Sequence, residues 1–137
     1  MNLEGHSAEA RQNWSFLAQV VELTSTQEFG GWNAVVLYYS ALHLVDSFLH
    51  VNGRDHGQSH AQRQAALVEL VKARRLSQAS LDAYAYLTSR SRSFRYGGIC
   101  VSHSEYQELV TRDFRRLELE IAERLRQPKF DRLPFER

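Results

Sequence analysis

The sequence has little of three residue types, and each scarcity is informative. Its single cysteine, Cys100, cannot form an internal disulfide, so a reducing compartment is the default expectation. Its two prolines, Pro128 and Pro134, both lie near the C-terminus, so no proline interrupts a helix before them. Only Lys72 and Lys129 are lysines; arginine, whose planar fork of donors suits phosphate and carboxylate, supplies the other positive charges.

A strong net charge and a long hydrophobic run are also missing. The 17 basic and 16 acidic residues nearly cancel, so affinity for a polyanion must come from local clusters. No hydrophobic run is expected to approach the roughly 20 residues that cross a bilayer, and Met1–Gln12 lacks the apolar core of a signal peptide. We expect a soluble cytoplasmic protein with no membrane partner, formed by one domain (residues 1–137) whose residues 128–137 are a C-terminal tail.

The hydrophobic pattern is helical along most of the chain. Helices are expected over about Ser7–Thr24, Trp32–Val51, Ser59–Arg74, Gln78–Tyr96 and His103–Arg126. The second is apolar around most of its circumference, which predicts the most buried helix. Ser59 with Gln62, and Ser102 with Glu105, match the capping box that opens a helix. The predicted fold class is all-α, an antiparallel bundle of four or five helices.

An arginine cluster at the end of the fourth expected helix is the strongest functional signal. Arg90, Arg92 and Arg95 fall within six residues, beside Phe94 and Tyr96, and two glycines follow that should stop the helix. Guanidinium groups bind phosphate oxygens and aromatic rings stack on bases, so RNA or a nucleotide is the favoured ligand class. The alternative is structural, because cations at a helix C-terminus also offset the macrodipole.

A second cluster follows the second expected helix, where Arg54, His60 and Arg63 lie in or next to a polar turn. Histidine moves protons near neutral pH and arginine stabilises charge on a phosphorane-like transition state, so metal-independent RNA cleavage is one interpretation. His60 would then be the general base or acid. The alternative is a simple polar connection. The residues predicted to take part are, as catalytic groups, His60, Arg54, Arg92 and Arg95, and, as binding groups, Arg63, Arg90, Tyr96, Tyr39 and His43.

A metal site is a separate hypothesis. His43, Asp46 and His50 are spaced three and four apart, so their side chains share one helix face. Two imidazoles and a carboxylate are ligands typical of zinc. The alternative is that His43 is a hydrogen-bonded core histidine and that Asp46 and His50 are solvated. We favour that alternative and expect neither a metal nor a cofactor.

A longer pattern resembles a known family. Residues 32–49 form a helix of small and aromatic residues with two tyrosines before His43, and they are followed by a loop with His60 and later by Ser91–Tyr96. Over about residues 8–126 the chain resembles HEPN-domain proteins. The resemblance implies an antiparallel helical bundle, often dimeric. Its active members place a histidine four to six positions beyond an arginine that a polar residue follows, and Arg54 with His60 matches that pattern.

The HEPN superfamily includes metal-independent RNases of defence and toxin–antitoxin systems, and also noncatalytic members that bind nucleotides or nucleic acids. We therefore expect a protein that acts on RNA or a nucleotide-type anion, as a homodimer or beside a partner protein. Whether it is an enzyme stays open. One alternative is a noncatalytic nucleotide-binding, RNA-binding or antitoxin-like accessory module, and the other is a metal-binding bundle that uses His43, Asp46 and His50.

Overall fold

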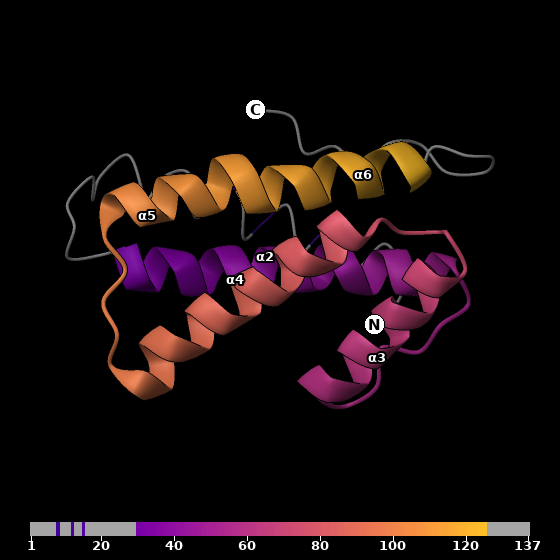
Figure 1. The fold of residues 1–137 in the computed structure, drawn as a ribbon, viewed down its shortest axis with the longest axis horizontal. Helices are drawn as coiled ribbons and strands as arrows, with labels where there is room; N and C mark the ends of the chain where they lie inside the picture. The colour runs from indigo at the N-terminus through magenta and orange to yellow at the C-terminus, as the bar shows by residue number, and fades with distance from the viewer. Residues whose placement is uncertain (1–7, 9–11, 13–14, 16–29, 126–137) are drawn as a thin grey trace.

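The computed structural model describes residues 30–125, together with Ala8, Gln12 and Ser15. Its elements are α2 (Gly30–Val51), α3 (His60–Lys72), α4 (Gln78–Gly97), α5 (His103–Glu108), the π-helical turn η2 (Leu109–Phe114) and α6 (Arg115–Leu125). The described residues contain four packed helical rods and no strand, which confirms the all-α prediction (Figure 1). The expected first helix, apart from those three residues, and the tail at residues 128–137 lie outside the described part.

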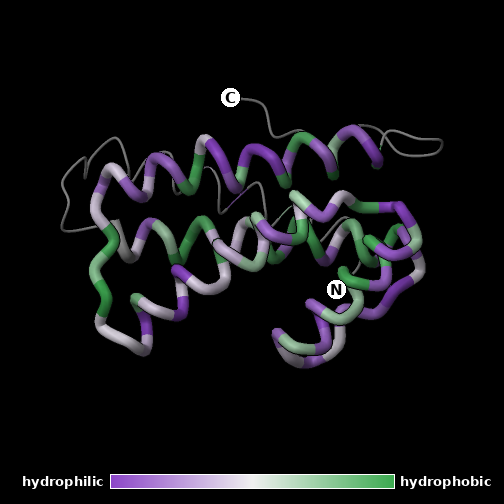
Figure 2. Tube along the Cα trace, in the orientation of Figure 1, coloured by the Kyte–Doolittle hydropathy of each residue, from purple (hydrophilic) through white to green (hydrophobic). Residues whose placement is uncertain are grey.

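Helix α2 is the centre of the bundle. It packs against α4 and against the rod formed by α5, η2 and α6, which runs alongside it (Figure 1). Helix α4 crosses α2 obliquely and also contacts that rod, and α3 packs against α4 on the side of the bundle where α2 ends. Its hydrophobic colouring in Figure 2 agrees with that position. The largest side chains that are almost fully buried are Tyr38, Tyr84, Phe48, Phe114, Leu37, Leu44, Leu49, Leu67, Leu70, Leu87 and Leu117. Five of these side chains lie on α2, more than on any other helix, which agrees with the prediction that α2 is the most buried helix.

The length and composition of α2 correct one sequence expectation. By length and composition, Trp32–Val51 is long and apolar enough to cross a membrane, whereas the sequence pattern predicts no such segment. Most of this stretch is buried inside the bundle, which is how the central helix of a packed core behaves. Serine, histidine and aspartate side chains interrupt its apolar sequence, which therefore does not stand out as one hydrophobic segment.

The helix boundaries follow the predicted capping residues. Ser59 Oγ accepts a hydrogen bond from Gln62 N at the start of α3, and Ser102 Oγ accepts one from Glu105 N at the start of α5, each 3.1 Å long. Gly98 ends α4 with a φ of 66°, a left-handed conformation that glycine adopts without strain. The predicted helix starts and the predicted stop after α4 are confirmed.

The expected helix over His103–Arg126 is regular only in part. Leu109–Phe114 forms a π-helical turn, which the hydrophobic spacing did not reveal. In a π-helix, hydrogen bonds join residues five positions apart, so two such residues lie on nearly the same side, and Leu109 and Phe114 both face the core. In an α-helix, with 3.6 residues per turn, two residues five positions apart would point in different directions. Leu117 then continues the buried face into α6.

Candidate functional site

Two adjacent tyrosines on α2 join the start of α3 to the end of α4. The rings of Tyr38 and Tyr39 are 5.2 Å apart, but their hydroxyls contact different helices. The buried Tyr38 hydroxyl lies 2.7 Å from His60 Nδ1 on α3. The half-buried Tyr39 hydroxyl accepts a hydrogen bond of 2.9 Å from Arg95 Nη1 on α4. The two predicted clusters, separated in sequence, are therefore linked through this tyrosine pair.

His60 is the first residue of α3 and is half-buried. Desolvation lowers the pKa of its imidazole, and the positive charges of Arg63, Arg92 and Arg95 lower that pKa further. The positive end of the α3 dipole acts in the same direction. At neutral pH the ring is therefore neutral, and with Nδ1 bonded to Tyr38 its other nitrogen, Nε2, is left to interact with a ligand.

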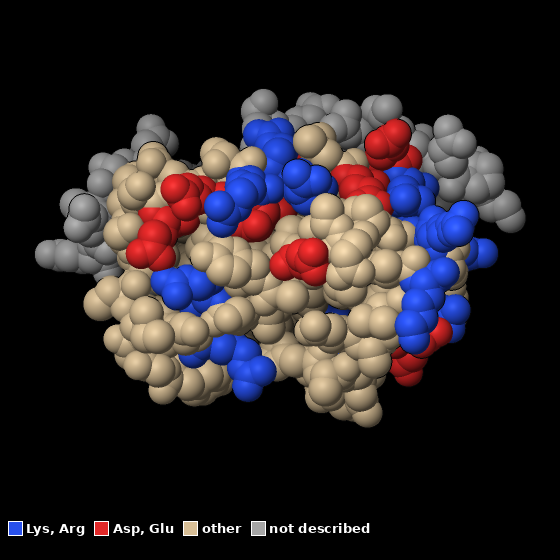
Figure 3. All heavy atoms as spheres, viewed as in Figure 1, with Lys and Arg blue, Asp and Glu red and all other residues tan. Residues whose placement is uncertain are grey.

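Arg92 and Arg95 carry positive charge that no carboxylate among the described residues neutralises. Both side chains are exposed. The guanidinium carbon of Arg95 lies 5.0 Å from the centre of the Tyr96 ring and 5.8 Å from that of the Tyr39 ring. These cation–π contacts position the guanidinium group without neutralising its charge. Figure 3 shows basic side chains over the last turns of α4 and a hollow between them and α3. An anion placed there meets guanidinium groups in water-accessible positions.

Exposed aromatic rings lie beside these arginines. Phe94 packs edge-to-face against Trp32, with ring centres 5.1 Å apart, which brings the start of α2 against the end of α4. Trp32 is 60% exposed and Tyr96 is 73% exposed. Planar, exposed rings next to unneutralised guanidinium groups combine the two contacts that single-stranded nucleic acids use, stacking and phosphate binding.

Two of the predicted binding residues instead tie helices together. Arg63 is buried and donates from Nε and Nη2 to the two carboxylate oxygens of Asp46 on α2, at 2.6 and 3.2 Å. Arg90 donates from Nη2 to Glu105 Oε2 on α5 at 2.7 Å. Both guanidinium groups therefore already bind carboxylates of this chain, and their role in binding an external anion stays a prediction.

Arg54 is not brought to His60. Its backbone N–H donates to the Leu49 carbonyl near the end of α2, at 2.9 Å, and its side chain is exposed. From Tyr38 to Leu49 the helix rises about 16 Å, at 1.5 Å per residue over eleven residues. Accordingly, Arg54 is not among the charges that lower the pKa of His60. Arg54 and His60 match the arginine–histidine spacing along the chain, but Arg54 is bonded near the end of α2 and His60 to Tyr38.

The three hypothetical metal ligands, His43, Asp46 and His50, differ in burial and in their partners. Asp46 is buried and bound to Arg63, so the expectation that it is solvated was wrong. His50 is exposed and His43 is half-buried. Within the described part of the chain, no group of three His, Cys, Asp or Glu side chains has a metal-binding arrangement. A carboxylate that binds both nitrogens of a guanidinium group is unavailable to a cation.

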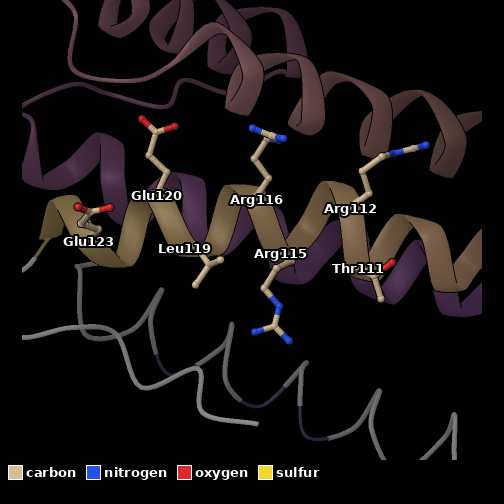
Figure 4. Close-up of a pocket in the computed structure, with 7 residues that line it drawn as sticks. All are labelled: Thr111, Arg112, Arg115, Arg116, Leu119, Glu120 and Glu123. Carbon is tan, nitrogen blue, oxygen red and sulfur yellow. The ribbon is translucent and has the colours of Figure 1, made fainter.

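A second hollow, of about 600 Å³, lies on η2 and α6 (Figure 4). It is lined by Thr111, Arg112, Arg115, Arg116, Leu119, Glu120 and Glu123. Arg115 and Leu119 point away from Arg116 and Glu120, so these side chains do not converge on one point. Because one helical stretch supplies all the described lining, we place no site there.

No family model, no curated protein and no solved structure matches this chain. The fold and the site therefore rest on its own residues.

Sequence reasoning missed three members of the site's support, Tyr38, Tyr84 and Asp46. Nothing local in the sequence indicates that Tyr38 meets His60 across 22 positions. Asp46 did leave a signal, because a carboxylate inside an otherwise apolar helix needs a buried partner. Arg63 is that partner.

Proposed function

We propose that this protein binds RNA, or a nucleotide-type anion, at the surface formed by His60, Arg92, Arg95 and Tyr96, and that it cleaves RNA without a metal. We further propose a HEPN-like bundle that works in the cytoplasm, in a toxin–antitoxin or defence system, as a homodimer or beside a partner protein. The observation that carries the ligand class is the tyrosine pair that joins His60 to Arg95, next to two exposed arginines, Arg92 and Arg95, for which the described residues supply no carboxylate partner.

The chemistry follows from the groups present. When a ribose 2′-oxygen attacks the adjacent phosphorus, the 2′-oxygen–phosphorus bond forms, the bond to the 5′-oxygen breaks, the 2′-hydroxyl loses its proton and the 5′-oxygen gains one. Negative charge grows on the phosphate oxygens, and the guanidinium groups of Arg92 and Arg95 stabilise it. His60 would assist the reacting oxygens by donating a hydrogen bond or by transferring a proton. None of these roles requires a metal.

A noncatalytic binding role is the second candidate, and the environment of Arg95 favours it. Its guanidinium group is held by the Tyr39 hydroxyl and lies against the Tyr96 ring, an arrangement prepared for binding a phosphate next to a stacked base. Binding of this kind needs no proton transfer by His60. The two candidates use the same surface and differ only in turnover.

The test uses a labelled single-stranded RNA incubated with the full chain in EDTA. If the protein is an RNase, wild type cleaves, His60→Ala abolishes cleavage while binding persists, and Arg92→Ala weakens both. Arg116→Ala is the matched control, because it removes an exposed arginine from α6, away from the tyrosine pair. Salt-sensitive binding without cleavage assigns the noncatalytic role. Wild-type protein that neither binds nor cleaves any RNA or nucleotide overturns the proposal.

A further inference from the structure

The hydrogen bond between Tyr38 and His60 contains information about the proton on the histidine. A neutral imidazole carries one N–H and one bare nitrogen, and the bond made by one nitrogen decides the state of the other. Here Nδ1 lies 2.7 Å from the Tyr38 hydroxyl. The direction of this one bond therefore determines what Nε2 offers to a ligand.

Burial fixes that direction. Tyr38 is 1% exposed, and desolvation raises the pKa of its hydroxyl, so the hydroxyl keeps its proton at neutral pH. Among the described residues, His60 Nδ1 is the only atom with which that hydroxyl makes a hydrogen bond of ordinary geometry. If Nδ1 carried the proton instead, the buried hydroxyl proton of Tyr38 would have no acceptor, which costs more than a hydrogen bond gains.

The Tyr84 hydroxyl supports the same direction. It is buried on α4 without a hydrogen-bond partner of ordinary geometry among the described residues, and its ring lies 6.2 Å from that of Tyr38. The Tyr84 hydroxyl therefore makes no hydrogen bond of ordinary geometry with Tyr38. The acceptor in place for the Tyr38 proton is His60 Nδ1, at 2.7 Å.

We infer that Tyr38 is a positioning residue that holds neutral His60 in the tautomer with its proton on Nε2, so that the ring presents an N–H donor to the arginine-bearing surface. The tautomer rests on the geometry alone, whereas its consequence for RNA rests on the proposed function. A donor at Nε2 matches an acceptor oxygen of a phosphate and not an ammonium or amide N–H.

For RNA cleavage this assigns His60 a specific part. A neutral ring with its proton on Nε2 donates a hydrogen bond to a nonbridging phosphate oxygen, or to the 5′-oxygen that leaves. It has no bare nitrogen facing the ligand with which to take the 2′-hydroxyl proton, because Nδ1 is occupied by Tyr38. The general-base role considered for His60 is therefore the weaker assignment, and the donor role is the one that Tyr38 supports.

The tautomer is measured directly by nitrogen-15 NMR of the imidazole rings in the uniformly labelled full chain, at a pH above 7 where His60 is neutral. His60→Gln identifies the His60 signals. Wild type should show a bare Nδ1 and a protonated Nε2. Tyr38→Phe, which removes only the hydroxyl, should lower the ratio of the Nε2–H form to the Nδ1–H form about five-fold, the effect of one ordinary hydrogen bond.

Tyr39→Phe is the matched control, because it removes the neighbouring hydroxyl that contacts Arg95 and leaves the bond to His60 in place. Its His60 tautomer ratio should equal that of wild type. A wild-type ring with its proton on Nδ1 overturns the inference without any variant, so the test survives a Tyr38→Phe chain that does not fold. An unchanged ratio in a folded Tyr38→Phe overturns it as well.

RNA binding and cleavage are measured separately on the same samples. A protein with the Nε2–H tautomer that neither binds nor cleaves RNA keeps the role of Tyr38 and overturns the proposed function. A protein that cleaves RNA with the opposite tautomer does the reverse. The two failures are therefore distinguishable.

Discussion

The two ends of α4 treat polar and charged groups in opposite ways. At its N-terminal end, the backbone N–H of Ser77 and the hydroxyls of Ser77 and Ser80 all donate to the carboxylate of Glu120 on α6, which also accepts from Arg124. At its C-terminal end, Arg92 and Arg95 are exposed, and no carboxylate among the described residues pairs with them. One end satisfies its charges internally and the other leaves them for a partner.

This difference separates stability from function. A carboxylate at a helix N-terminus satisfies backbone donors and the positive end of the dipole, so Glu120 holds α4 against α6. Arg92 and Arg95 are three positions apart on one helix, where like charges repel each other weakly. Their favourable interaction with the negative end of the dipole reduces that repulsion. A bound anion would offset this repulsion. A ligand would thus stabilise the C-terminal end of α4 as the carboxylate of Glu120 stabilises the N-terminal end.

Arg63 gives the largest expected effect and tests whether a paired arginine belongs to the fold. We expect Arg63→Ala to lower the free energy of unfolding by about 3–5 kcal/mol, because it leaves the carboxylate of Asp46 buried without its partner. Urea unfolding followed by circular dichroism measures the change.

A double variant checks the reason for that loss. Asp46→Leu combined with Arg63→Met removes both charges and keeps the volume, so it should be more stable than Arg63→Ala alone. If the double variant is instead the less stable of the two, the stranded carboxylate is not the cause. Arg92→Ala is the comparison at the other end, with a change of at most about 0.5 kcal/mol expected for an exposed site.

Glu120 gives the next largest effect. We expect Glu120→Ala to lower the free energy of unfolding by about 1.5–3 kcal/mol, the range for hydrogen bonds to a charged group. Burial raises the pKa of this carboxyl, but the hydrogen bonds from Ser77, Ser80 and Arg124 together outweigh burial and lower it. Because the pKa in the folded state is depressed, the stabilisation is present above the ordinary carboxyl pKa and is lost as the pH falls through the folded value.

The pH dependence therefore supplies a control for Glu120. The difference in unfolding free energy between wild type and Glu120→Ala should shrink in acid, whereas Glu123→Ala, an exposed neighbour on α6, should match wild type at every pH. A difference that does not change between neutral and acidic pH would mean that the carboxylate charge at this end of α4 does not stabilise the fold.

The helices themselves were predictable because their signals are local. Ser59, Ser102 and Gly98 start or stop helices through their own side chains or φ angles, and the apolar spacing of α2 marks a core helix from sequence alone. The π-helical turn at Leu109–Phe114 was not predicted, because it only shifts which side chains of the helix face the core. Packing against α2 and α4 determines that shift, and no local sequence pattern reveals it.

The site was predictable only in its exposed part. Arg92 and Arg95 follow the apolar stripe of α4 and emerge from the core at its end, as the sequence indicated. The partners of Arg63 and His60 depend on where α3 packs against α2, which no local rule gives. Arg54 illustrates the converse, because it is close to His60 along the chain while its backbone is bonded to Leu49 and the His60 ring to Tyr38, at separate turns of α2.

Replacing Arg92 sharpens the comparison at the C-terminal end of α4, where we propose that RNA binds. We expect Arg92→Ala to weaken binding of a short single-stranded RNA about ten-fold with almost no loss of stability. A lost phosphate contact should also reduce the slope of log affinity against log salt concentration by about 0.7. Fluorescence anisotropy at several salt concentrations measures both quantities. Arg116→Ala, with the same change in net charge, should preserve the slope; an equal loss in both variants would mean that binding follows net charge and not this surface.

The smallest expected effect concerns the proton on His60. Desolvation, then Arg63, then Arg92 and Arg95 lower its pKa, so removal of one exposed arginine should raise that pKa part of the way toward the ordinary histidine value. Proton NMR titration of the imidazole in Arg92→Ala measures the change, and added salt should shift wild type in the same direction because it screens exposed charges. Arg116→Ala should titrate as wild type does. If Arg92→Ala also titrates as wild type does, the end of α4 does not act on the imidazole and the two predicted clusters do not form one site. A raised pKa ties the exposed end of α4 to His60 by a measurement that requires no ligand.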